Sequence, residues 1–132
     1  MTEADIDAAL GDAIRKHVEW KVRLFKAAST GRLDVSPAMI GNCQGCAFGR
    51  WLDDPSMTPQ IRAGKPWQVV YRLHKEFHQI AGDVAALIAE NQTDQALDMM
   101  HGLYKQKSDK LVSALALWRS ELRLGAVHAP AS

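Results

Sequence analysis

The sequence lacks an excess of charge of either sign, and this absence excludes several classes of protein. Its 132 residues include 16 Lys and Arg against 15 Asp and Glu, which gives a net charge of +1. A nucleic-acid-binding surface or a polybasic membrane-binding tail needs a concentration of basic residues that this balance does not provide. We therefore expect neither nucleic acid nor an anionic membrane surface as a partner.

Long hydrophobic runs are also missing. No stretch approaches the roughly 20 apolar residues that a transmembrane helix requires. The acidic start Met1–Asp5 has no apolar signal-peptide segment behind it. We therefore expect no membrane insertion and a cytoplasmic location. The alternation of apolar and polar residues that is typical of strands is missing as well, so strands are not expected.

What is present is the composition of an ordinary globular domain. Hydrophobic residues make up 47% of the chain and charged residues 23%, a balance that allows a core to form without disulfides. The sequence shows no internal repeat and no low-complexity stretch. Its length predicts a single domain, which we place at residues 1–125, followed by a loose C-terminal tail at 126–132.

Apolar residues recur at three- and four-residue spacing in three long segments, which is the pattern of amphipathic helices. The predicted helices span about residues 2–28, 66–90 and 93–124. A capping box of Thr2 and Asp5 begins the first helix, and Gly31 follows its end. Thr93 is the expected N-cap of the last helix. Val18 is placed on the apolar stripe of the first helix.

The segment between the first two long helices is less regular and rich in glycine and proline. Ser36 and Pro37 predict an N-cap followed by proline at the first helical position, which opens a short turn through Ile40. A second short helix is predicted from about residue 44 to 53. The fold class is therefore all-α. We expect an antiparallel four-helix-bundle-like domain with a short helical insert between the first and second long helices.

Three histidines fall where the helical pattern calls for apolar residues. His17 lies on the stripe of the first helix, and His74 and His78 lie one turn apart on that of the second. Side chains four residues apart have Cβ atoms roughly 5–6 Å apart, so both imidazoles can reach one metal ion. A lone buried histidine is more often a hydrogen-bonded core residue, but three in one small bundle need partners that offset their desolvation. Asp12 or a backbone carbonyl could orient His17.

The chain has two cysteines, Cys43 and Cys46, both in the insert. In a reducing compartment such a pair is more often metal-binding or redox-active than a structural disulfide. No βαβ pattern surrounds it to suggest a thioredoxin-like motif, and no second pair exists to complete a four-cysteine zinc site. Cys46 is followed by Phe48 and Trp51, which are natural core anchors, and by Gly49, which permits close helix approach.

In this order, these residues resemble the chemoreceptor zinc-binding domain family. His17 matches the family's histidine on the first helix. The segment Cys46–Trp51 matches its Cys-x-apolar-Gly-x-aromatic element, and His74 with His78 matches its His-x-x-x-His element. The resemblance covers the chain from about residue 5 to 124, and four matching positions in order make it specific.

The resemblance implies one Zn²⁺ held inside a helical bundle by a set of four side chains, His17, Cys46, His74 and His78. Three imidazoles and a thiolate form a closed tetrahedral shell that suits zinc. Such a shell has no open coordination position, so hydrolytic catalysis is not favoured. The resemblance also implies a non-enzymatic sensor of zinc or of oxidants such as hypochlorous acid. It further implies a homodimer and a signalling partner in a chemoreceptor or diguanylate cyclase system.

Two other functions stay open at this stage. The zinc could be purely structural, so that it only stabilises a bundle that acts as an interaction module. A hemerythrin-like di-iron site would need bridging carboxylates, typically in Glu-x-x-His motifs, and no such Glu precedes His17, His74 or His78. Cys43 has three interpretations: a small packing residue, a redox partner for an oxidised Cys46, or an alternative zinc ligand.

Overall fold

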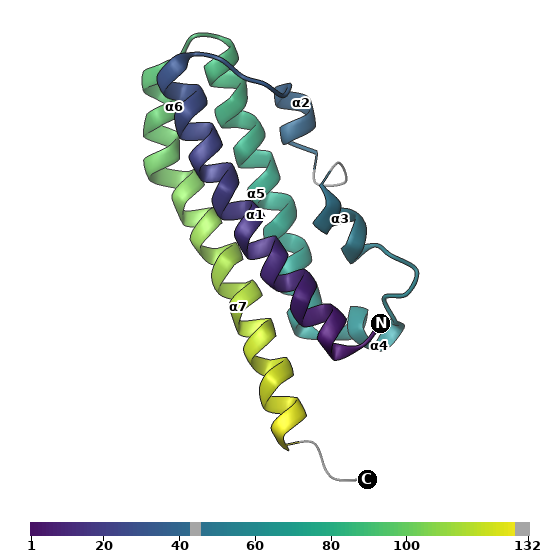
Figure 1. The fold of residues 1–132 in the computed structure, drawn as a ribbon. Helices are drawn as coiled ribbons and strands as arrows, with labels where there is room; N and C mark the ends of the chain where they lie inside the picture. Colours follow the sequence, from purple (N-terminus) through teal and green to yellow (C-terminus); the bar gives the residue numbers. More distant parts are fainter. Residues whose placement is uncertain (43–45, 129–132) are drawn as a thin grey trace.

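The computed structural model describes residues 1–42 and 46–128, which form an all-α bundle without strands (Figure 1). Three long helical columns make up the bundle: α1 (Glu3–Thr30), α5 (Lys65–Ala89), and a third column of α6 (Thr93–Met99), η2 (Met100–Tyr104) and α7 (Lys105–His128). The insert contributes the short helices α2 (Pro37–Ile40), α3 (Ala47–Leu52) and α4 (Pro59–Ala63), which pack against α5. The predicted fold class is confirmed.

The ends of α1 follow from its sequence. The Thr2 hydroxyl accepts a hydrogen bond from the backbone N–H of Asp5 at 3.1 Å, and the Asp5 carboxylate accepts one from the Thr2 N–H at 2.9 Å. Gly31 takes the left-handed conformation, with φ 71°, and its N–H donates to the Ala27 carbonyl. Only glycine adopts this backbone conformation without steric cost. The predicted capping box and stop of α1 are both confirmed.

The prediction that Val18 lies on the apolar stripe of α1 was wrong. Val18 is 46% exposed, whereas its neighbour His17 is buried. Adjacent residues on an α-helix point about 100° apart because one turn takes 3.6 residues. The buried face of α1 includes His17, and this rotation turns Val18 toward solvent.

The described part of the insert contains one more helix than its sequence predicts. α2 begins as expected, with Ser36 accepting a hydrogen bond at the helix start and Pro37 in the first turn. α4 begins in the same way at Thr58 and Pro59. The same capping signal could have revealed it. α3 begins at Ala47 rather than near residue 44, and the preceding residues 43–45 lie outside the described part of the chain.

The third column differs from the prediction at both ends and in the middle. Thr93 is the first residue of α6, and the N-cap is Gln92. The helix then widens into the single π-helical turn η2, which the apolar spacing does not reveal. Gly125 does not end α7, which continues to His128. The rest of the predicted tail, 129–132, lies outside the described residues, and the domain limit at residue 125 stays a prediction.

One continuous apolar core joins the columns and the insert. Its large side chains with less than 2% exposure include Leu10, Leu24, Leu52, Phe77, Ile88, Tyr104, Leu111 and Leu115. Burying one such side chain contributes roughly 1.5–3 kcal/mol, so the bundle has a core of its own around any metal. Among the described residues, no helix is both long and apolar enough to cross a membrane.

A pair of leucines on α7 tests this core. Leu115 is fully buried and Leu117 is 60% exposed. We expect Leu115→Ala to lower the free energy of unfolding by about 2–5 kcal/mol, because it leaves a cavity. The matched control Leu117→Ala should change it by less than about 0.5 kcal/mol. Urea denaturation measures both values, and equal effects would contradict the burial described for α7.

Candidate metal centre

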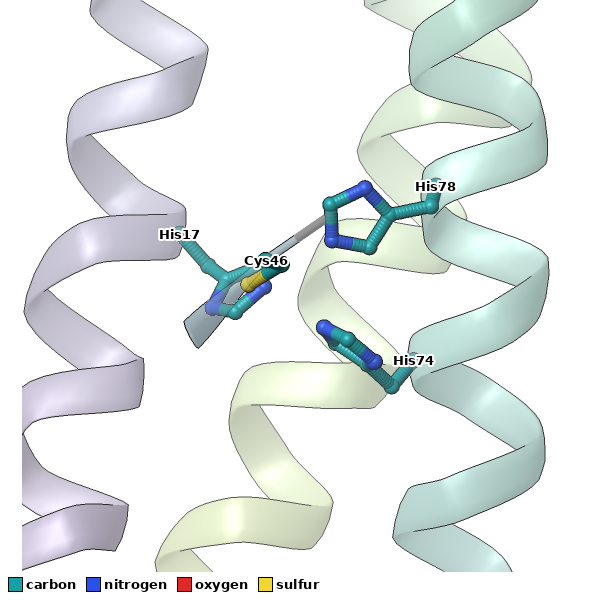
Figure 2. A group of neighbouring side chains, drawn as sticks. All are labelled: His17, Cys46, His74 and His78. Carbon is teal, nitrogen blue, oxygen red and sulfur yellow. The ribbon is translucent and has the colours of Figure 1, made fainter. Parts of the chain in front are cut away.

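Four side chains converge in the middle of the bundle (Figure 2). They are the four residues that the sequence analysis selected: His17 from α1, His74 and His78 from α5, and Cys46, the N-cap residue of α3. One ligand atom from each, an imidazole nitrogen or the cysteine sulfur, lies within 4.8 Å of all the others. The histidines are 1–4% exposed. Three separate segments of the chain therefore meet at one point.

The three imidazole rings surround this point and do not stack on one another. His74 and His78, one turn apart on α5, have ring centroids separated by 4.5 Å and planes inclined at 74°. The His17 ring lies 5.1 Å from His74 and 5.7 Å from His78, again edge to face. The rings are therefore not stacked, and one nitrogen of each lies within 4.8 Å of a nitrogen of the others, as shared coordination of an ion requires.

Backbone carbonyls fix the orientation of two of these rings. Nδ1 of His17 lies 2.7 Å from the Ala13 carbonyl, and Nδ1 of His78 lies 2.7 Å from the Ile40 carbonyl. A carbonyl can only accept a hydrogen bond, so in both rings Nδ1 donates, and in the neutral ring Nε2 carries the lone pair. Asp12 does not orient His17, because it pairs with Arg15. Of the two orienting groups considered for His17, the structure shows the carbonyl.

The Nε2 atoms of the three histidines are buried and have no hydrogen-bond partner among the described residues. An unsatisfied buried polar group costs about 1–3 kcal/mol, and here three such groups lie together. In the neutral rings of His17 and His78 this atom presents a lone pair, which a hydrogen-bond acceptor cannot satisfy, whereas one cation can bind all three nitrogens. The donor set, three imidazole nitrogens and a sulfur, fits zinc.

The surroundings of Cys46 favour its thiolate. Burial acts to raise the pKa of the thiol, but His17, His74, His78 and the backbone N–H of Gly49 outweigh it and lower the pKa to about 3. Burial also lowers the pKa of the His74 imidazole, although the nearby Cys46 opposes this shift. A thiolate and neutral imidazoles are the protonation states that metal coordination needs.

Aromatic side chains enclose the cluster. The Phe48 ring lies edge-on to His17 and His74, at 6.1 Å and 5.2 Å between centroids, and stacks on Trp51 at 5.5 Å. Phe77 approaches His17 to 5.1 Å from the α5 side. Such an apolar shell limits solvent access and strengthens electrostatic attraction between an ion and its ligands.

The enclosure is open beside the sulfur. Two hollows, of about 220 Å³ and 320 Å³, are both lined by Lys16, His17, Cys46 and Ala47. Cys46 itself is only partly buried. A small reagent can therefore reach Cys46 from solvent, and Lys16 lines both routes.

Sequence reasoning missed the group that orients His78. The Ala13 carbonyl lies four residues before His17, so the helix itself supplies it, but Ile40 lies 38 residues before His78 in a different element. Only the tertiary packing of α2 on α5 brings these two together. Cys43, the predicted redox partner, lies outside the described residues.

Comparison with protein-family models gives a match to the chemoreceptor zinc-binding domain over residues 17–85. The matched segment is a little over half of the chain. It begins at His17 and includes Cys46, His74 and His78, so all four converging side chains fall within it. Comparison with curated proteins and with solved structures gives no match.

Proposed function

The chain belongs to the chemoreceptor zinc-binding domain family, and from this membership we propose that it binds one Zn²⁺ through His17, Cys46, His74 and His78. We propose further that it is a non-enzymatic sensory domain. The observation that carries the zinc proposal is the set of three buried Nε2 atoms without partners beside the Cys46 sulfur. The thiolate and imidazoles together favour zinc over metals that prefer oxygen ligands.

The same donor set argues against the di-iron alternative. A di-iron centre is built with bridging carboxylates, and the cluster found among the described residues contains only histidines and a cysteine. Four protein ligands also fill a tetrahedral shell. This leaves no position for a substrate and supports a regulatory rather than a catalytic role.

The access to Cys46 supports a sensory zinc site over a purely structural one. A thiolate is the reactive form of cysteine, and hypochlorous acid can oxidise it: RS⁻ + HOCl gives RSOH + Cl⁻, with two electrons passing from sulfur to chlorine. The two hollows lead to this sulfur. The positive charge of Lys16 would raise the local concentration of anionic oxidants such as hypochlorite.

The position of Cys46 at the start of α3 supplies a structural response. Oxidation weakens the sulfur as a ligand and releases the beginning of α3, which carries Phe48 and Trp51. The Trp51 ring lies 6.2 Å from Trp118 on α7, so movement of α3 would reach the third column. We propose that Cys43 condenses with the oxidised Cys46 to a disulfide, with loss of water, and that zinc is then released.

A second copy of the chain and a signalling protein are the proposed partners. Val18 and Val22 are 46% and 66% exposed and lie one turn apart on α1, forming an apolar strip on a long helix. Such a strip suits a side-by-side homodimer. We propose that the dimer works in the cytoplasm with a chemoreceptor or diguanylate cyclase system.

Zinc content tests the proposed ligands directly. We expect one zinc per chain in the purified protein and a large loss of zinc in His17→Ala, Cys46→Ala, His74→Ala and His78→Ala. His101→Ala is the matched control, because His101 is exposed and should leave zinc content unchanged. Elemental analysis makes the measurement. Full zinc retention by His74→Ala and His78→Ala would refute the assignment.

Oxidation of the zinc-loaded protein distinguishes a sensory zinc site from a structural one. With one equivalent of hypochlorous acid, we expect modification at Cys46 and zinc release while the protein stays folded. Met39 is an internal competitor, because its side chain is 67% exposed and methionine is readily oxidised. Mass spectrometry, a zinc-binding dye and circular dichroism follow the three events. Oxidation of Met39 with Cys46 intact, or zinc release only on unfolding, would favour a structural zinc site.

Sedimentation tests the dimer. We expect the wild-type protein to sediment at about twice the chain mass of 14.6 kDa. Val22→Glu should sediment as a monomer, because it places a charge in the apolar strip of α1. Leu117→Glu changes an exposed leucine on α7 and should leave the dimer intact. A wild-type mass near that of one chain at micromolar concentration would exclude this assembly.

A further inference from the structure

α2 approaches α5 more closely than a side chain at the contact would allow. A Cβ atom added to Gly82 of α5 would lie 2.7 Å from Cα and 3.1 Å from N of Gly41, the C-cap residue of α2, and 3.3 Å from the Pro37 carbonyl oxygen. These are backbone atoms, so no rotamer change can relieve the overlap. The packing therefore requires glycine at position 82, although glycine destabilises a helix interior.

This contact lies directly beside the ring of His78. Gly82 is one turn after His78 on α5, so the two residues share a helix face. Ile40 immediately precedes Gly41, and its carbonyl accepts the hydrogen bond from Nδ1 of His78 at 2.7 Å. A displacement of α2 away from α5 would lengthen this bond and free the imidazole to rotate or change its tautomer.

We propose that Gly82 is a positioning residue for metal binding, because it seats α2 where the Ile40 carbonyl holds His78 with Nε2 facing the centre. The inference rests on the proposed zinc binding. Groups that orient a ligating histidine typically change metal affinity 10–100-fold when they are lost. Because coupling free energies are reciprocal, metal bound to His78 also holds α2 against α5.

Three glycine-to-alanine variants form a graded test. Gly82→Ala creates the overlap with backbone atoms. At Gly41 an added Cβ would have its nearest neighbour at 3.4 Å, and at Gly102 it would meet nothing within 4 Å. We expect zinc affinity to fall about 10–100-fold in Gly82→Ala, to fall much less in Gly41→Ala and to stay unchanged in Gly102→Ala. Competition with a chelating dye measures the affinities.

Spectroscopy distinguishes positioning from a general loss of stability. In Gly82→Ala we expect an altered visible spectrum of the cobalt-substituted protein and loss of the hydrogen-bonded Nδ1–H signal of His78 in NMR spectra. In the wild type, amide exchange in α2 should be slower with zinc than without it. Wild-type affinity together with an unchanged cobalt spectrum in Gly82→Ala would overturn the inference.

A second pair of variants tests the same inference if Gly82→Ala does not fold. Ser36 and Thr58 are exposed N-caps of α2 and α4, and each accepts a hydrogen bond from the helix backbone. Ser36→Ala should weaken zinc binding and the His78 signal, whereas Thr58→Ala should change neither; equal behaviour of the two would overturn the inference. If the wild type binds no zinc, the proposed function fails. If the wild type binds zinc and Gly82→Ala and Ser36→Ala bind it equally well, only this inference fails.

Discussion

Three imidazole nitrogens and one cysteine sulfur meet in the interior of the bundle. In His17 and His78, Nδ1 lies at a backbone carbonyl and donates to it, so Nε2 of the neutral ring is an acceptor, and Nε2 of all three histidines has no hydrogen-bond partner among the described residues. Burial makes such groups costly. A cation at their centre would offset this cost, and this is the physical basis of the zinc proposal.

The rest of the fold can be understood as the support for that cluster. α1 and α5 are long and well packed, and they present their histidines from rigid surfaces. The Ala13 carbonyl comes from the same helix as His17, but the Ile40 carbonyl must be brought to His78 by α2. The glycine contact at position 82 allows this approach. The four-residue helix α2 therefore places a backbone carbonyl against a buried histidine of α5.

The sequence predicted the parts of this architecture that depend on local periodicity. His17, His74 and His78 stand out because they occupy apolar positions of helical stripes. The α1 caps and the start of α2 follow from residue types with specific hydrogen-bonding roles. The π-helical turn η2 could not be predicted, because apolar spacing does not distinguish an α-helical from a π-helical turn. The Ile40 hydrogen bond could not be predicted either, because it depends on how α2 packs on α5 and a backbone carbonyl leaves no residue type to recognise in the sequence.

The four converging side chains are not anchored equally, and this difference bears on the proposed sensing. The histidines project from helices of 28 and 25 residues, whereas Cys46 only caps a helix of six. Loss of the sulfur as a ligand would leave the long helices and their core in place and would free α3 first. The most reactive of the four side chains thus lies at the start of the shortest of the three helices. A chemical change at Cys46 could therefore alter the surface of the domain without unfolding it.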